Sequence, residues 1–116
     1  QRLNKIKTIK LARHNLKLTQ DYTKQLVNSE LHQLFDDFTY GIQILDLLKK
    51  MIQTQEKYFQ QSEFLFKTGQ STITELQTSK IQLLTAQKNY NDQLLACRIT
   101  ELRLYQLSGS LLTAIN

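Results

Sequence analysis

Residues 67–72 of the chain read Lys67-Thr68-Gly69-Gln70-Ser71-Thr72, and the fold depends on this short segment. Gly69 tolerates a positive φ angle, which suits the residue that ends a helix. Ser71 or Thr72 can cap the N-terminus of the next helix, and Glu75, three residues after Thr72, completes the pattern of a capping box. The segment therefore predicts a tight turn between two antiparallel helices.

Apolar residues recur every seven positions on the N-terminal side of this turn. The residues in this frame are Leu31, Phe38, Leu45, Ile52, Phe59 and Phe66. Leu34 and Leu48 occupy companion positions three residues further on, and the stripe is widened by Ile44, Met51, Tyr58 and Leu65. Such a period is typical of a helix that packs in coiled-coil fashion.

The same period continues on the C-terminal side of the turn. The residues in the frame there are Leu76, Leu83, Tyr90, Cys97, Leu104 and Leu111. The two stripes have similar lengths on either side of Gly69, so we expect them to pack on one another with a left-handed supercoil. We call this predicted contact the seam.

The sequence thus predicts an all-α fold, a long antiparallel helical hairpin of coiled-coil type. We expect a helix over about 2–67, a turn over about 68–71 and a helix over about 72–113, which at 1.5 Å per residue are roughly 95 and 60 Å long. Proline is absent and glycine occurs only at positions 41, 69 and 109, so few positions can interrupt a helix.

The N-terminal part of the first helix differs from the rest. Lys10, Lys17 and Lys24 replace the apolar residues of the seven-residue frame, although Ile9 and Leu16 keep the segment partly apolar. The second helix is too short to reach this region. We expect the first thirty residues to have no partner within the chain and to be covered by other segments or subunits.

The net charge of +5 is concentrated at this end. The cations that precede the first acidic residue, Asp21, are Arg2, Lys5, Lys7, Lys10, Arg13 and Lys17. Such a cluster attracts a phosphate backbone or an anionic membrane surface. However, the steps between the cations spread them around the helix and no aromatic residue is interleaved, so we expect a solvated end and no nucleic-acid partner.

The sequence offers no catalytic constellation. His14 and His32 lie five helical turns apart, roughly 27 Å along the axis, and cannot share a metal ion. His32 and Asp36 have i, i+4 spacing but lack a third ligand, and Cys97 is best interpreted as a small buried residue of the seam. We predict no catalytic residues, no metal, no cofactor and no enzymatic activity.

With 116 residues, of which 41% are apolar, the chain has room for one domain with a thin core. It begins at Gln1 rather than methionine, and no apolar run is long enough for a membrane-spanning helix. We interpret residues 1–116 as a single hairpin fragment of a larger protein.

Three motifs resemble a known family. They are Phe66-x-x-Gly69-x-x-Thr72-Ile73-x-Glu75-Leu76, then Leu83-x-x-Ala86-Gln87-x-x-Tyr90, then Leu104-Tyr105-x-Leu107-Ser108-Gly109. Together they are similar to the helical repeat of the outer-membrane efflux proteins, the TolC-like channels. The likeness is most specific from about Phe59 to Gly109, and the ending Ser108-Gly109-Ser110-Leu111-Leu112 favours the second of the two repeats.

The resemblance implies a place in the Gram-negative cell envelope. Three chains of this family form a β-barrel in the outer membrane and a helical tunnel through the periplasm, used in tripartite efflux or type I secretion. This chain would be one hairpin of the tunnel wall, without its barrel strands and its other repeat. The intact protein would be a homotrimer.

The resemblance also assigns functional residues. The hairpin tip of these channels docks a periplasmic adaptor (membrane fusion) protein, and through it an inner-membrane transporter. The matching residues here are Lys67, Thr68, Gly69, Gln70, Ser71 and Thr72. An inward-facing carboxylate just beyond the tip helps to close the entrance in the family, and Glu75 matches it.

The chain departs from the family pattern at some positions. Thr78 stands where some members have a second acidic residue, and Ser71 stands where some have a basic one. Any network of gating charges is therefore thinner here. Leu94 and Leu95 also make the return helix bulkier than the alanine-rich helix of the family.

Two other classes of protein fit a helical hairpin. One is the coiled-coil hairpin of a periplasmic adaptor itself, which would be flanked by two lipoyl-like half motifs; the Phe66-x-x-Gly69 signature argues against it. The other is a cytoplasmic coiled-coil scaffold or membrane-surface protein that uses the basic N-terminal end, for which salt-dependent binding to anionic vesicles is the test.

Overall fold

The computed structural model describes the backbone of residues 1–115 and the side chains of residues 1–110. Helix α1 spans Arg2–Lys67 and helix α2 spans Ile73–Ile115, and the described backbone contains no strand. The predicted all-α hairpin and the bounds of its first helix are confirmed. The second helix begins one residue later than predicted because Thr72 is its N-cap, and it extends beyond residue 113.

Of the three glycines, Gly69 alone interrupts the helices. Its φ angle is +74°, as the turn requires, whereas Gly41 lies within α1 and Gly109 within α2. The segment Ser108-Gly109-Ser110 therefore does not end the second helix. A glycine within a helix costs up to about 1 kcal/mol relative to alanine, so Gly41 is expected to have a packing role.

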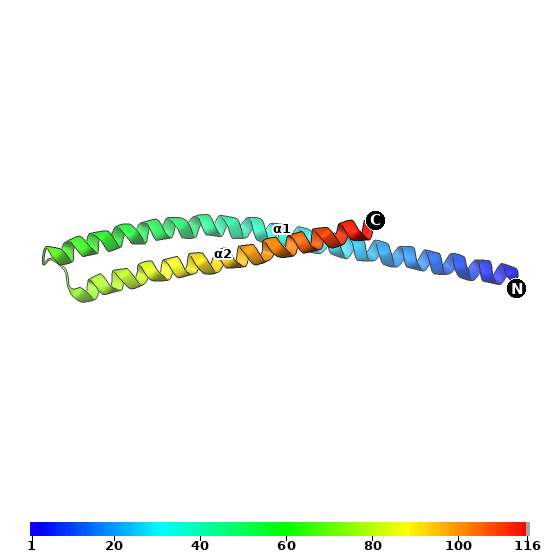
Figure 1. Ribbon diagram of the computed structural model, residues 1–116, viewed down its shortest axis with the longest axis horizontal. Coiled ribbons are helices and arrows are strands. Elements are labelled where there is room, and N and C mark those ends of the chain that lie inside the picture. Colours follow the sequence, from blue (N-terminus) through cyan, green and yellow to red (C-terminus); the bar gives the residue numbers. More distant parts are fainter. Residues whose placement is uncertain (116) are drawn as a thin grey trace. The chain divides into compact units, whose positions relative to one another are not determined.

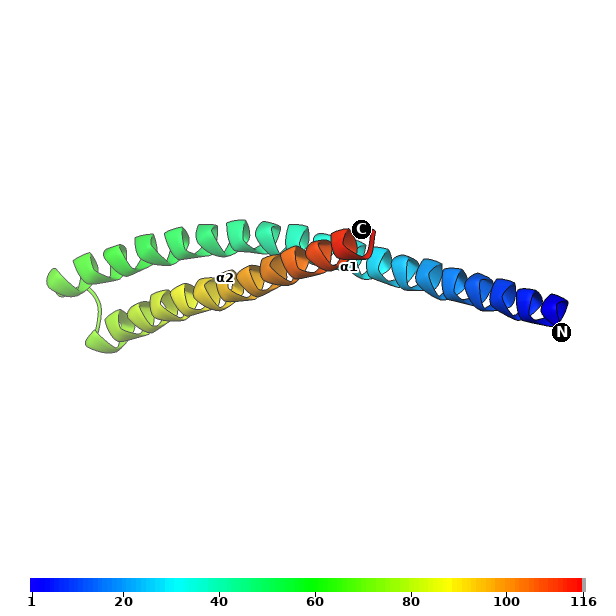
Figure 2. The same ribbon diagram turned by 45° about the vertical axis from the view of Figure 1, so that its right-hand side comes forward.

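Internal contacts divide the chain into two units, and each contains a part of both helices. Unit 2 is Asp37–Leu102, and unit 1 contains Gln1–Asp36 together with the chain from Arg103 onward. In unit 2 the return helix α2 runs alongside α1 in the opposite direction, from the turn in green towards orange (Figure 1; Figure 2).

The seam of unit 2 buries small residues and leaves larger ones half-buried. Its buried residues are Gly41, Ser62, Ser79, Ala86 and Cys97, of which Ser79 has no exposed surface. Small residues let two helix backbones approach closely, but a pair of helices cannot enclose a large side chain from every side. Leu45, Ile52 and Phe59 therefore stay half-buried although they lie on the seam.

The contact between Gly41 and Cys97 sets the register of the two helices. Counting outward from this pair in opposite directions places Phe59 opposite Ser79, and Ile52 opposite Ala86. The Nζ atom of Lys80 lies 6.0 Å from the centroid of the Phe59 ring, in agreement with this register. At these two points large residues of α1 face small residues of α2, whereas the same register places the small Ser62 of α1 opposite Leu76 of α2.

The structure corrects three predicted members of the apolar stripe. The side chain of Phe66 is 38% exposed because its register partner is the N-cap Thr72, beyond which α2 offers nothing to cover it. Met51 and Tyr58, expected to widen the stripe, are also largely exposed. The other predicted seam residues are at least half-buried, and the side chain of Leu111 lies outside the described residues.

Unit 1 contains the N-terminal part of α1 and the C-terminal part of α2. Its seam residues Leu31, Leu34, Leu104 and Leu107 are half-buried. Residues 1–26 are exposed throughout, as predicted for a segment without a partner in the chain.

Candidate functional site

The backbone of the hairpin tip is fixed by a Schellman motif. The Gln70 N–H donates to the carbonyl of Leu65 at 2.7 Å, and the Gly69 N–H donates to that of Phe66 at 3.1 Å. These two bonds satisfy carbonyls that the end of α1 would otherwise leave open. They require the left-handed conformation that Gly69 adopts. The sequence therefore specifies where α1 stops and in which direction the chain leaves it.

A capping box starts α2, as the sequence predicted. The Glu75 N–H donates to Thr72 Oγ1 at 3.2 Å, and the Thr72 N–H donates to Glu75 Oε2 at 3.4 Å. The two residues satisfy each other's open donors at the helix N-terminus. Thr72, rather than Ser71, is the N-cap.

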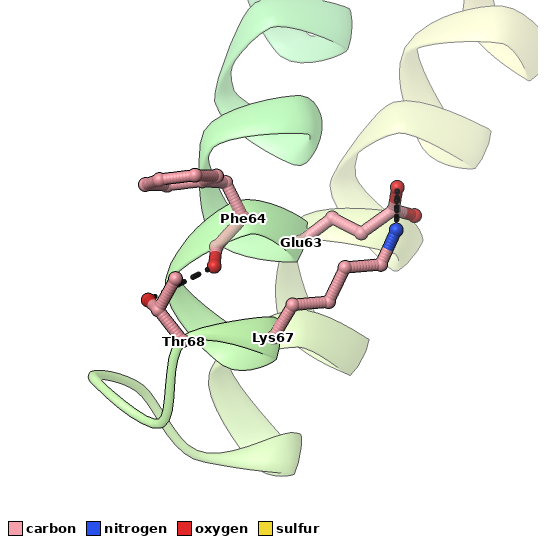
Figure 3. Close-up of polar contacts among 4 residues, drawn as sticks. All are labelled: Glu63, Phe64, Lys67 and Thr68. Carbon is pink, nitrogen blue, oxygen red and sulfur yellow. Dashed lines mark hydrogen bonds and ion pairs between the residues drawn. The ribbon is translucent and has the colours of Figure 1, made fainter.

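The last turn of α1 carries further local interactions, shown in Figure 3. Lys67 Nζ pairs with Glu63 Oε1 at 3.5 Å, and the Thr68 hydroxyl donates to the carbonyl of Phe64 at 3.1 Å. The ion pair is exposed and contributes at most about 1 kcal/mol. Its main consequence is to hold the Lys67 side chain back along α1 rather than out beyond the tip.

The six tip residues predicted from the resemblance lie together in this turn. All of them are exposed except Ser71, which is half-buried and whose Oγ is shielded without a hydrogen-bond partner. The Oγ atom has almost no exposed surface, so a molecule docked on the tip does not reach it in this conformation. Gln70 offers an exposed amide beside it.

Apolar side chains next to the turn add to this polar surface, and the sequence prediction missed them. Phe64 is 64% exposed and Ile73 is 50% exposed, and Phe66 is partly exposed. Figure 3 shows the Phe64 ring pointing away from α2. Exposed aromatic residues are the anchors that most often dominate protein interfaces. Phe64 and Ile73 lie outside the seven-residue frames of the seam, which is the signal that marks them as available for contact.

Glu75, the predicted gate residue, is exposed near the start of α2. Its Oε2 atom accepts the Thr72 N–H, so the carboxylate has a structural role in the capping box. Its other oxygen remains available to a cationic partner. The gate assignment therefore stays a prediction.

Exposed apolar residues also follow the flanks of unit 2. On α1 they include Tyr40, Leu47, Met51 and Tyr58, and on α2 they include Ile81, Leu84, Leu95 and Leu102. We call these the α1 stripe and the α2 stripe. The helical repeat places the α1 stripe about 100° from the seam and the α2 stripe about 150° from it. Helix α1 also has a shallow depression lined by Leu47, Met51 and Thr54.

The three residues considered as metal ligands or nucleophiles, His14, His32 and Cys97, differ in their exposure. His14 and His32 are exposed, whereas Cys97 is buried in the seam. Within the described part of the chain, no three residues of the types His, Cys, Asp and Glu form a group that could hold a metal ion.

Neither helix, over its described residues, has a stretch that is long and apolar enough to cross a membrane. The chain matches no family model, no curated protein and no solved structure.

Proposed function

We propose that this chain is a periplasmic tunnel-wall hairpin of a TolC-like outer-membrane channel, and that its tip docks an adaptor protein. The observation that carries the proposal is the tip itself. Gly69, Thr72 and Glu75, which belong to the sequence motif that resembles this family, fix the backbone of the turn. The turn and its neighbouring residues present polar and apolar groups to solvent.

The tip suits tip-to-tip docking on physical grounds. Its conformation is set by local hydrogen bonds, so little backbone entropy is lost on binding. Phe64 and Ile73 provide apolar anchors, while the exposed amide of Gln70 provides hydrogen-bonding groups. The proposed adaptor contact is thus Lys67–Thr72 extended by Phe64 and Ile73, and Glu75 is the proposed entrance-gate carboxylate.

The flanks of unit 2 support a place in a wall of helices. The α1 stripe and the α2 stripe lie on different faces of the hairpin, so one hairpin can contact a neighbour on each side. Contacts of this head-to-tail kind close into a ring when the rotation between neighbours returns to the first subunit, as the proposed channel requires. A homotrimer of a protein with two such repeats would bury both stripes and cover the half-buried leucines and phenylalanines of the seam.

Transport through such a channel needs no catalytic residue in this component. The inner-membrane transporter, linked through the adaptor, supplies the energy in tripartite efflux or type I secretion. We accordingly propose that the chain is not an enzyme and that the parent protein lies in the Gram-negative outer membrane, with this segment in the periplasm.

Cell fractionation of the full-length parent protein, followed by light scattering of the purified material, tests this proposal. We expect the protein in the outer-membrane fraction and a mass of three chains in detergent. A cytoplasmic, monomeric parent protein would contradict the proposed function.

A further inference from the structure

The N-terminal part of α1 carries a line of cations that is more ordered than the sequence suggested. Lys10, Lys17 and Lys24 are seven residues apart, and Arg13 lies between the first two. At 100° per residue these four fall within an arc of about 60° on the helix. We call them the basic ridge. The expectation that the cations spread around the helix holds for Lys5 and Lys7 but is wrong for the ridge.

The basic ridge lies on the same face of α1 as the seam. Lys10, Lys17 and Lys24 belong to the frame of Leu31, and Arg13 belongs to the frame of Leu34. In unit 1 the residues of these two frames are half-buried at Leu31 and Leu34 and exposed throughout residues 1–26. The ridge therefore continues an established helix-packing line beyond the end of its partner helix.

Aliphatic side chains accompany the ridge. Ile6 lies within its arc, and Ile9 and Leu16 lie directly beside it, all three well exposed. The opposite face is uncharged, with Thr8, Asn15 and Thr19. A partner on the ridge side meets cations and aliphatic groups together. The far side also exposes apolar residues, Leu11, Leu18, Tyr22 and Leu26, but it has no cations.

We propose that residues 6–27 of α1 bind an acidic amphipathic helix of a partner protein. Such a helix would place carboxylates opposite the four cations and aliphatic residues against Ile6, Ile9 and Leu16. Charge complementarity selects the acidic partner, and the coiled-coil spacing of the ridge selects a helix. The stems of the lysines add apolar contact while their ammonium groups stay near water.

Other anionic partners fit this face less well. A nucleic-acid backbone would pair with the cations but would leave the three aliphatic side chains against phosphates and water. A membrane surface favours an apolar sector that is separate from the charged one. Here the exposed apolar residues are divided between the ridge side, with Ile6, Ile9 and Leu16, and the far side, with Leu11, Leu18, Tyr22 and Leu26. No single apolar sector holds them all, and lipid on the far side would leave the cations pointing away from the headgroups.

Binding measurements on the whole chain with a synthetic helical peptide test the proposal. The peptide has about four heptads with glutamate and leucine at the positions that face the ridge, and a matched peptide has glutamine in place of glutamate. We expect the acidic peptide to bind at least about tenfold more tightly, and its affinity to fall as NaCl rises from about 50 to 500 mM.

Two charge-matched variants locate the contact. Lys10→Glu/Lys17→Glu reverses the charge at two of the four ridge positions. Lys5→Glu/Lys7→Glu makes the same change of charge on the same helix but outside the ridge. We expect the first to weaken binding of the acidic peptide by roughly tenfold or more and the second by less than about threefold. Far-UV circular dichroism checks that both variants keep their helical content.

Vesicles rich in phosphatidylserine and a duplex DNA serve as competing probes. Equal weakening by the two variants, or tighter binding to vesicles or DNA than to the acidic peptide, would overturn the proposal. Retained binding by the glutamine peptide would also overturn it. Because every change lies in residues 5–17, the result is independent of what the tip binds.

Discussion

A Cβ atom added to Gly41 would lie 2.8 Å from the Sγ atom of Cys97, which is closer than real Cβ atoms approach a sulfur. Gln93 closes the same contact, because its Nε2 atom donates to the Gly41 carbonyl at 3.4 Å across the seam. The two helices of unit 2 therefore approach one another at a point where one side has no side chain.

Replacing Gly41 with alanine should destabilise the hairpin despite the higher helix propensity of alanine. The propensity gain of about 1 kcal/mol is opposed by overpacking of about 1–3 kcal/mol, since the short Cys97 side chain cannot move away. We expect a lower urea midpoint, followed by circular dichroism. In Gly41→Ala/Cys97→Ala the clash is removed, so the double change should cost at least about 1 kcal/mol less than the sum of the single changes. Additive effects would contradict the close contact.

Gly69 and Gly109 should respond to alanine with opposite signs. A Cβ atom would meet nothing within 4 Å at either position, so only backbone conformation differs. Gly69 has a φ angle of +74°, and alanine there should lower the free energy of unfolding by about 1 kcal/mol. Gly109 is helical, and alanine there should raise it by about 0.5–1 kcal/mol. Equal effects in chemical denaturation would argue against the Schellman turn.

Removing the N-cap of α2 should also weaken the hairpin. Thr72→Ala deletes the acceptor of the Glu75 N–H and should cost about 1 kcal/mol in thermal or urea unfolding. Thr72→Ser keeps the hydroxyl and should retain most of the stability. Thr85→Ala, an exposed change in the middle of α2, is the control and should not destabilise. A Thr72→Ala variant as stable as Thr85→Ala would exclude a capping role.

The α1 stripe should drive self-association of the chain. Leu47→Glu/Met51→Glu places two charges on it and should shift sedimentation velocity profiles towards the monomer, because exposed apolar patches favour association. Gln43→Glu/Gln53→Glu makes the same change of charge at exposed positions of the same helix. If both variants sediment alike, charge repulsion rather than the stripe controls association.

The helices and the tip could be predicted because their signals are local. Gly69, Thr72 and Glu75 act through hydrogen bonds within six residues, and a period of seven marks the large apolar side chains. The packing partners of these side chains were not predictable from apolar residues alone. Gly41, Ser62 and Ser79 are buried although none of them has an apolar side chain. Ser62 and Ser79 lie opposite the large residues Leu76 and Phe59, and Gly41 lies where Cys97 approaches the α1 backbone.

The candidate site divides in the same way. The polar residues of the turn follow from the sequence motif, whereas the exposure of Phe64 and Phe66 depends on where α2 begins to cover α1. Phe66 keeps the period of the seam and yet lies outside it. Phe59, two helical turns before Phe66, is half-buried against α2, whereas Phe66 lies opposite the start of α2 and stays partly exposed.

Binding of the hairpin to the adaptor hairpin encoded beside its parent gene is the most direct test of the account. Isothermal titration calorimetry should compare the wild-type chain with Gln70→Glu/Ser71→Glu and Phe64→Ser at the tip, and with Gln43→Glu/Gln53→Glu and Tyr40→Ser on the flank. We predict that the tip changes weaken binding by roughly tenfold or more while the flank changes leave it within about threefold, with helical content unchanged. An adaptor hairpin that does not bind the folded chain, or that binds the tip variants as tightly as the wild type, would contradict a docking tip.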